Sequence, residues 1–411
     1  MASKGHSLCG YDPDQKLVEG LQKNSLPIHE PDLDGLFAAT RERIQFHSTP
    51  HDLAGCDIVF VARDVATDQT DNSDLSLLDQ IIDEVLAVVP AKVPVVLLSQ
   101  VHPGYTRRLL EKRSNIFYQV ETLIFGRAVE RGLYPERYIL GCKSPSEPLP
   151  EAYRALLDSY GCPTLKMRYE SAELAKIAIN FYLVSSVSTT NTLAEVCEQI
   201  GADWNEIAPS LRLDKRIGQH AYLTPGLGIA GGNLERDLIT VNKIAGDKGT
   251  DNGVVASWIQ NSRYRKDWAV RVLHQEFYAK GGAKSSSVAL WGLAYKQDTK
   301  STKNSPALHF AEGAAGTPVR AFDPQVELTP ELRTRLGSEF KQVGAALDAC
   351  DGADVLVILT PWQEFTKITP SAIAARMRGK IVIDPMGMLD SSACQNAGLK
   401  QIRMGVGEQN V

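Results

Sequence analysis

The sequence lacks the features of a membrane or secreted protein. No apolar run reaches the roughly 18 residues that a membrane-spanning helix needs, and Met1 to Tyr11 contains no apolar core of a signal peptide. These absences argue against a membrane-spanning class. We therefore expect a soluble chain located in the cytoplasm, with no membrane partner.

Paired cysteines and an excess of charge of one sign are also missing. The seven cysteines are scattered along the chain and form no C-x-x-C pair. This spacing argues against a metal site or a disulfide framework and favours reduced thiols. The net charge is only −5, so the composition indicates no nucleic acid or other large polyanion as a partner.

What the sequence does contain is a glycine-rich stretch in the middle of the chain. From Arg216 to Leu238 it reads RIGQHAYLTPGLGIAGGNLERDL. Glycine permits turns with positive φ and lets a ligand approach the backbone closely. A glycine-rich turn that opens a helix presents unpaired N–H groups to an anion or a sugar hydroxyl. Taken alone, such a stretch is as often a tight turn as a binding loop.

The regions before and after this stretch alternate between strands and helices. Continuous apolar runs predict buried parallel strands, and longer periodic segments predict helices. The main predicted strands are 56–62, 93–99, 286–291 and 355–360, and the main predicted helices are 73–89, 171–200 and 254–278. The alternation predicts an α/β fold with two doubly wound, Rossmann-like domains joined by a helical middle domain with a long central helix. We expect domain boundaries at 1–165, 166–280 and 281–411.

Several motifs in collinear order resemble those of the UDP-glucose/GDP-mannose dehydrogenase family, and the resemblance covers nearly the whole chain. The glycine-rich stretch resembles the family's active-site loop, R-I-G followed by P-G-x-G-[YF]-G-G-x-C-x-x-K-D. The segment that begins at Ala172 matches the pattern A-E-x-x-K-x-x-x-N. SQVHPGYT at 99–106 resembles S-T-V-P-P-G-T-T, with Gln100 in place of a threonine that positions water. Tyr118 to Leu123 resembles the P-E-F-L segment.

The resemblance implies roles for individual residues. Lys176 and Asn180 are four residues apart and share one helix face, and they would hold the oxyanion and the water at the reacting carbon. Glu121 would be the acid/base glutamate, although a solvated surface carboxylate is the usual alternative. The implied site residues are Glu121, Lys176, Asn180, Asp237 and Asn233 for catalysis, Arg216, Gly226, Gly228, Gly231 and Lys296 for substrate binding, and Asp12 and Lys303 for cofactor binding.

Asp12 has two interpretations. It ends a predicted strand, Ser7 to Tyr11, where a dinucleotide-binding unit places an acid for the adenosine ribose. It is equally well placed as the N-cap of a helix that begins at about Pro13. The first strand and the G-x-G-x-x-G turn belong about twenty residues upstream of such an acid. We therefore expect either a start of the reading frame upstream of Met1 or a lost pyrophosphate-binding turn.

The implied chemistry is oxidation of a nucleotide sugar with NAD as cofactor. In the family, a second oxidation passes through a thiohemiacetal on a cysteine. Asn233 stands at that position and cannot form the adduct, and Arg236 stands where the family has lysine. The leading hypothesis is a dehydrogenase of a UDP- or GDP-sugar that forms a homodimer through its long central helices. The alternatives are a redox-neutral epimerase and a non-catalytic protein that binds a sugar nucleotide.

Overall fold

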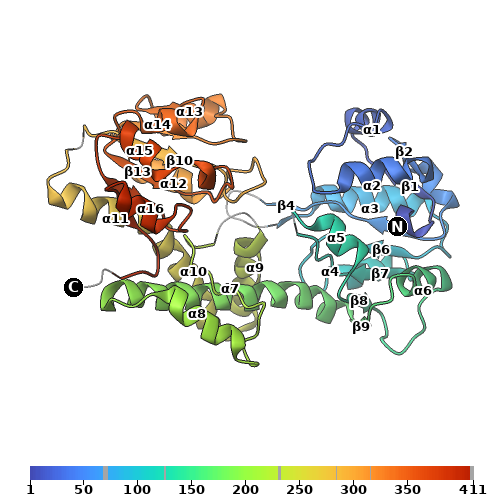
Figure 1. Ribbon diagram of the computed structural model, residues 1–411. Helices are drawn as coiled ribbons and strands as arrows, with labels where there is room; N and C mark the ends of the chain where they lie inside the picture. Colours follow the sequence, from blue (N-terminus) through green and yellow to red (C-terminus); the bar gives the residue numbers. More distant parts are fainter. Residues whose placement is uncertain (68–72, 125, 230–232, 284, 315, 408–411) are drawn as a thin grey trace. The chain divides into compact units, whose positions relative to one another are not determined.

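The structure is a computed structural model that describes residues 1–67, 73–124, 126–229, 233–283, 285–314 and 316–407 (Figure 1). The chain divides into two compact units, Met1–Ile179 and Asn180–Val411, and each is described by itself. Both are α/β, as the sequence predicts. The finer division into three domains stays a prediction. In the described ranges, no helix is long and apolar enough to cross a lipid bilayer.

The first unit is built on a five-stranded sheet in the order β3-β6-β7-β8-β9. All neighbouring strands are parallel except β7 and β8. The helix α3 (Ser76–Val88) buries Leu78, Ile82 and Val85 in the core of this unit. The strands are β3 (Val59–Val61), β6 (Val95–Leu97), β7 (Ile116–Gln119), β8 (Tyr138–Cys142) and β9 (Thr164–Arg168). The helix predicted at 73–89 and the strands predicted at 56–62 and 93–99 are confirmed, each over a shorter range.

Two further strands, β1 (Leu8–Tyr11) and β2 (Ile44–His47), form a separate parallel pair. The next helix, α1 (Gln15–Gln22), begins at Asp14, whose carboxylate accepts the N–H groups of Lys16 and Leu17. Asp12 instead accepts the N–H of Asp14 at 2.9 Å. The interpretation of Asp12 as a helix N-cap is therefore wrong, because the helix starts two residues later than predicted. The smaller elements are α2 (Leu33–Thr40), β4 (Ala66–Thr67), β5 (Ser73–Asp74), α4 (Tyr105–Arg108), α5 (Ala128–Leu133) and α6 (Glu151–Asp158).

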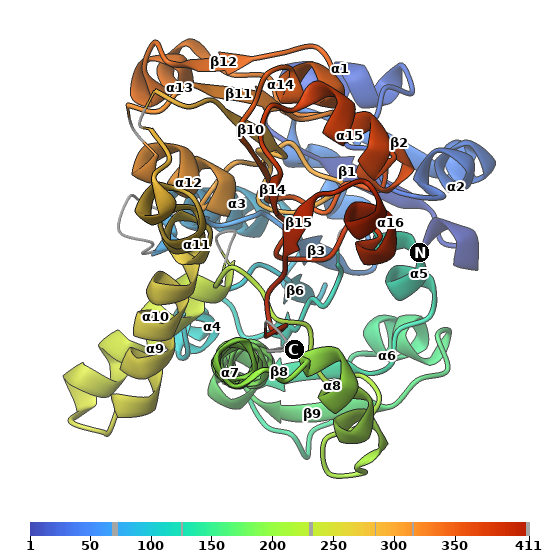
Figure 2. The same cartoon turned by 60° about the vertical axis from the view of Figure 1, so that its left-hand side comes forward.

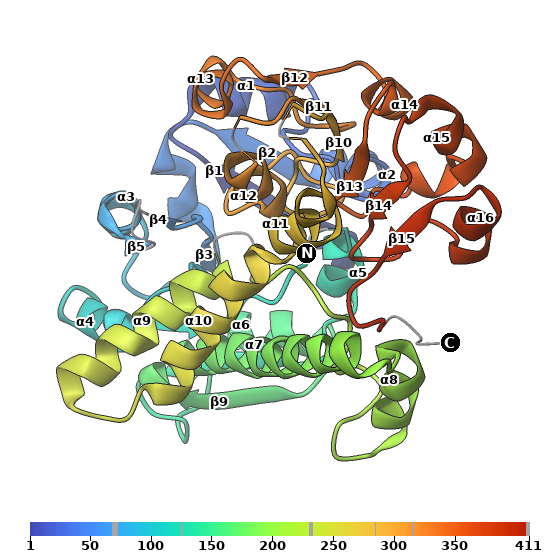
Figure 3. The same cartoon turned by 90° about the vertical axis from the view of Figure 1, so that its left-hand side faces the viewer.

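A single long helix, α7 (Tyr169–Ile200), confirms the helix predicted at 171–200. The other helices of the middle region are α8 (Trp204–Leu213), α9 (Asn233–Lys248), α10 (Gly253–Lys266) and α11 (Trp268–Glu276). Figure 3 shows α9 and α10 side by side, and the two helices are in contact.

The single helix predicted at 254–278 is wrong, because it is broken at Asp267 into α10 and α11. Trp268, Ala269 and Leu273 of α11 are almost completely buried in the core of the second unit's sheet. The chain therefore changes direction at Asp267 so that α11 can pack there. Helix-forming residues stand on both sides of Asp267, so the sequence does not indicate a break there.

The second unit contains a six-stranded, entirely parallel sheet in the order β12-β11-β10-β13-β14-β15. This order reverses between β10 and β13, which is the pattern of a doubly wound fold. The strands are β10 (Val288–Trp291), β11 (Val319–Phe322), β12 (Phe340–Gln342), β13 (Val355–Ile358), β14 (Ile381–Ile383) and β15 (Lys400–Ile402). The helices are α12 (Pro306–Gly313), α13 (Pro330–Leu336), α14 (Ala346–Cys350), α15 (Pro370–Arg376) and α16 (Ser391–Asn396), and Figure 2 shows α16 beside β15.

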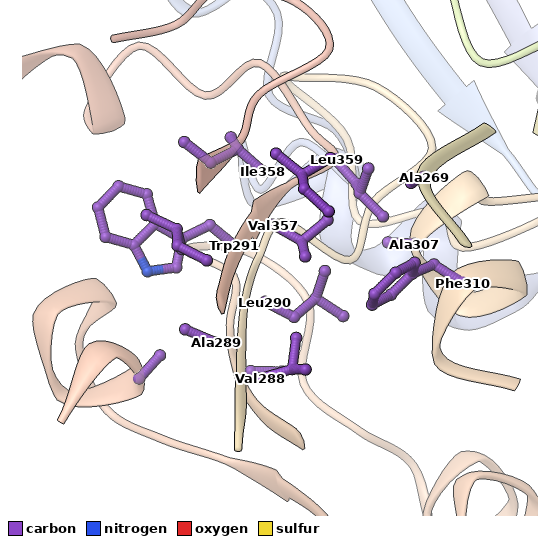
Figure 4. Packing of buried hydrophobic residues seen from close by; sticks show 14 of the residues in the cluster. Ala269, Val288, Ala289, Leu290, Trp291, Ala307, Phe310, Val357, Ile358 and Leu359 are labelled. Carbon is purple, nitrogen blue, oxygen red and sulfur yellow. The ribbon is translucent and has the colours of Figure 1, made fainter. Parts of the chain in front are cut away.

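The two central strands of this sheet are buried on both faces. Every residue of β10 and β13 is buried. In Figure 4, Trp291 lies on one side of the strands, and Ala307 and Phe310 of α12 lie on the other. Burial on both faces explains why these strands appear in the sequence as continuous apolar runs rather than as alternating ones.

Candidate active site

In the first unit, the structure brings together two predicted catalytic residues, Lys176 and Glu121. Lys176 is half-buried on α7 and donates a hydrogen bond from Nζ to the backbone oxygen of Glu121 at 2.6 Å. The carboxylate of Glu121 accepts the N–H of Leu123 at 2.5 Å. The contact between the predicted pair is therefore made through the main chain, and it fixes the loop that follows β7 against α7.

Asp12 lies at the carboxyl end of β1, as predicted. Its Oδ2 is 3.7 Å from Nη1 of Arg63, a residue that follows β3. Its side chain is 26% exposed, so the carboxylate remains accessible from solvent. An accessible acid at the carboxyl end of a parallel strand suits hydrogen bonds from ribose hydroxyls.

In the second unit, Asn180 and Asp237 form a direct hydrogen bond. Nδ2 of Asn180 on α7 donates to Oδ2 of Asp237 on α9 at 2.5 Å. Asp237 is only 2% exposed, and Nε of the equally buried Arg236 is 3.8 Å from its Oδ1. A carboxylate in such a dry site interacts strongly with any charge that forms nearby. Asn233 is the first residue of α9, and its side chain lies outside the described part of the structure.

The glycine-rich stretch is held between α7 and α10 at two points. The N–H of Gly226 donates to Oδ1 of the buried Asn191 at 2.7 Å, and the N–H of Ile229 donates to Oγ of Ser262 at 2.8 Å. Gly228 between them has φ +78°, and a Cβ atom there would overlap the backbone oxygen of Ser262. Both features require glycine. The sequence motifs do not indicate that Asn191 or Ser262 supports this loop.

Two other predicted residues of this stretch are placed differently. Arg216 lies in a turn after α8, with Nη2 at 2.6 Å from Oδ2 of Asp214 and with 89% of its side chain exposed. Gly231 lies outside the described residues. The structure therefore brings Gly226 and Gly228 together with their supports, and it gives no such contact for Arg216.

The loop between β10 and α12 carries the two predicted lysines, Lys296 and Lys303. Lys296 is half-buried and Lys303 is exposed. Glu235 of α9 accepts hydrogen bonds from Nζ of Lys266, at 2.6 Å, and from Nδ2 of Asn304. Glu235 therefore fastens this lysine-bearing loop to the same helix that carries Asp237.

Comparison with known sequences shows what these features belong to. Residues 1–158 match the NAD binding domain of the UDP-glucose/GDP-mannose dehydrogenase family, residues 170–263 its central domain and residues 289–391 its UDP binding domain. The chain belongs to this family. The resemblance stated from the motifs is thereby confirmed, and the three matches follow one another in the expected order.

Individual members of the UDP-glucose/GDP-mannose dehydrogenase family are similar along their whole length. A UDP-glucose 6-dehydrogenase from Rickettsia bellii is 28% identical, with 98% of this chain and 95% of that protein covered. A solved UDP-glucose dehydrogenase from Pyrobaculum islandicum is 25% identical and has a TM-score of 0.83, with 99% and 93% covered. A UDP-D-ManNAc dehydrogenase from Pyrococcus horikoshii has a TM-score of 0.84 at 24% identity, with 98% and 94% covered, which shows the same fold.

The family membership confirms the predicted class. The members are nucleotide-sugar dehydrogenases with an NAD binding domain, so NAD as cofactor and the classification as an oxidoreductase are confirmed at the level of the family. The UDP binding domain agrees with a nucleotide sugar as the other ligand.

Proposed function

We propose that this chain is an NAD-dependent dehydrogenase that oxidises a CH–OH group of a nucleotide sugar to the aldehyde. The observation that carries the proposal is the hydrogen bond between Asn180 and Asp237 in a site where Asp237 is almost completely buried. The residues lie 57 positions apart, and the fold brings an amide and a buried carboxylate of the predicted catalytic set into direct contact.

Each group of the proposed site has a defined task. Oxidation of an alcohol removes the hydroxyl proton, and a positive group stabilises the alkoxide that develops. The ammonium group of Lys176 supplies that charge, and the carboxylate of Asp237 receives the proton directly or through a water held by Asn180. NAD⁺, when bound, would accept a hydride, that is two electrons and one proton, from the sugar carbon.

A second oxidation to the carboxylate requires a nucleophile that Asn233 does not provide. The amide nitrogen of asparagine has no available electron pair for attack on an aldehyde, whereas a cysteine thiolate has. We propose that the reaction releases one NADH for each sugar and stops at the aldehyde or its hydrate. The sugar nucleotide is held by the backbone of Gly226 and Gly228 and by the cationic group of Lys296.

Several residues fit the cofactor and the diphosphate. The accessible carboxylate of Asp12 at the end of β1 suits the adenosine ribose. We assign Lys303, exposed on the loop before α12, to the cofactor, and Arg216 and Gly231 to the substrate, on the basis of the family motifs.

The proposal is tested by incubating the purified chain with NAD⁺ and a series of UDP- and GDP-sugars. The absorbance of NADH and the mass of the sugar product are followed together. One NADH for each aldehyde formed supports the proposal. An isomerised sugar without NADH supports the epimerase alternative instead. Tight binding of a UDP-sugar in calorimetry, with no change in its mass, supports the non-catalytic alternative.

We also propose a homodimer in the cytoplasm. On α7, five large apolar side chains are 43–81% exposed. These are Leu174, Tyr182, Leu193, Val196 and Ile200. The last three follow one another at spacings of three and four, so they form a stripe on one face of the helix. Light scattering should give twice the chain mass, and Val196→Glu should reduce it to one chain.

A further inference from the structure

A buried carboxylate near the start of α7 plays no part in the site described so far. Glu173 has 0% of its surface exposed. Its Oε2 accepts the N–H of Gly104 at 2.5 Å, and its Oε1 accepts the N–H of Thr106 at 2.8 Å. Burial raises the pKa of Glu173, and the two N–H groups act against this rise. A buried acid is unfavourable for folding unless it is well paired, and here the two N–H groups of one loop pair it.

The two N–H groups belong to the loop that follows β6 and leads into α4. This loop contains Gln100, for which the motif resemblance predicts the position of a water-positioning threonine. Gly104 has φ +92°, which gives the backbone its turn. Tyr105, between the two bonded residues, is 2% exposed and donates from its hydroxyl to Asp79 of α3 at 2.6 Å. The far end of the loop is therefore held by Glu173 of α7 and, through the hydroxyl of Tyr105, by Asp79 of α3.

Glu173 and Lys176 are three residues apart on α7, so their side chains leave the helix on nearly the same face. Lys176 holds the loop after β7 through the backbone of Glu121. Because β6 and β7 are parallel neighbours, the loops at their carboxyl ends start from the same edge of the sheet. One turn of α7 thus fastens both of these loops.

We infer that Glu173 is a positioning residue for the dehydrogenase reaction, an inference that rests on the proposed function. It sets the place of Gln100 relative to Lys176 by holding the loop 99–106 on α7. Glu173 itself has no exposed surface and does not touch the substrate. A loosened loop would leave substrate binding nearly intact and slow the chemical step, because small displacements of catalytic groups are costly.

The test compares Glu173→Gln with Glu170→Gln. Glutamine keeps the shape of the side chain but has one acceptor oxygen, so one of the two N–H groups would face an amide NH₂. Glu170 lies one turn earlier on α7 and binds Arg107 of α4 with Nη2 at 2.9 Å, in a pair that is about 40% exposed. It is a matched control, because it contacts the same segment from the same helix through a side chain rather than through the backbone.

For Glu173→Gln we expect kcat to fall by about tenfold or more, while KM for the nucleotide sugar and for NAD⁺ changes by less than about twofold. Hydrogen exchange of the amides in 99–106 should become faster. Glu173→Asp keeps two acceptor oxygens and should recover part of kcat. Glu170→Gln should leave kcat, KM and the exchange of this loop as they are in the parent chain.

Three results would count against the inference. The first is an unchanged kcat in Glu173→Gln, and the second is a loss of activity that only follows the loss of folded protein. The third result applies if Glu173→Gln does not fold. In that case, a Glu173→Asp variant with normal KM and unchanged kcat would contradict the inference. A parent chain without turnover on any nucleotide sugar would instead overturn the proposed function. Hydrogen exchange in Glu173→Gln would then decide alone whether Glu173 holds the loop.

Discussion

The amide group of Asn180 and the carboxylate of Asp237 are joined by a hydrogen bond of 2.5 Å between α7 and α9. Asn180 is half-buried and Asp237 is almost completely buried. The amide can donate to Asp237 and still accept a hydrogen bond through its oxygen. The pair therefore combines a fixed negative charge with an orienting group, which is the arrangement that proton removal from an alcohol requires.

Replacement of Asp237 by asparagine keeps the shape of this pair and removes its charge. We expect kcat to fall by about 100-fold or more, because the proton of the hydroxyl has lost its acceptor. Stability should fall by roughly 1–3 kcal/mol, since Arg236 loses the buried carboxylate at 3.8 Å from its Nε. Steady-state kinetics and thermal unfolding measure the two effects. Asp247→Asn, an exposed position on the same helix, is the control and should change neither.

Replacement of Lys176 by methionine should abolish turnover without unfolding the chain. Methionine keeps the length and the apolar stem but has no charge for the developing alkoxide, so kcat should fall by about 100-fold or more. Lys166→Met is a matched control, because Lys166 also donates to a backbone oxygen, that of Glu147 at 2.8 Å. It should retain full activity. Persistent turnover in Lys176→Met would show that the assignment of the oxyanion group is wrong.

The parts of the fold that the sequence predicts are those with a strong local pattern. The helix α7 has a long uninterrupted periodic segment, and the strands β10 and β13 are continuous apolar runs. The break at Asp267 could not be predicted, because helix-forming residues stand on both sides of it. It arises from the burial of Trp268 and Leu273 on the sheet, which is a tertiary effect.

In the site, too, local sequence patterns predict some residues, whereas contacts between distant parts of the chain determine the roles of others. The motifs select Lys176, Asn180 and Asp237, and the structure places Asn180 and Asp237 in contact. Glu173 is the glutamate of the same motif as Lys176, but the sequence gives it no role, because a buried acid cannot be told from a solvated one in a helix of mixed composition. Its role depends on two N–H groups that lie 67 and 69 positions away in the chain.

Gly228 should be sensitive to the smallest possible substitution. Its φ of +78° and the overlap of an added Cβ with the backbone oxygen of Ser262 predict that Gly228→Ala lowers stability by about 1–3 kcal/mol. Gly246→Ala is the control. Gly246 lies inside α9 with no atom near the added methyl group, so it should gain about 0.5–1 kcal/mol. Denaturant unfolding of both variants checks the prediction, and equal effects would contradict the loop geometry.

The prediction from the motif that Asn233 stands at the family's cysteine position makes the stoichiometry of the reaction a direct readout. In the parent chain we expect one NADH for each sugar consumed, because an aldehyde without a thiol acceptor is not carried to the second oxidation.

Asn233→Cys introduces a thiol at the start of α9, where a helix N-terminus favours the thiolate. The ratio of NADH to sugar should then rise toward two, and a covalent sugar adduct should be visible in the mass of the protein. Asn205→Cys adds a thiol at an exposed position of α8 and should leave the ratio at one. A ratio of two in the parent chain would show that its second oxidation needs no nucleophile at residue 233.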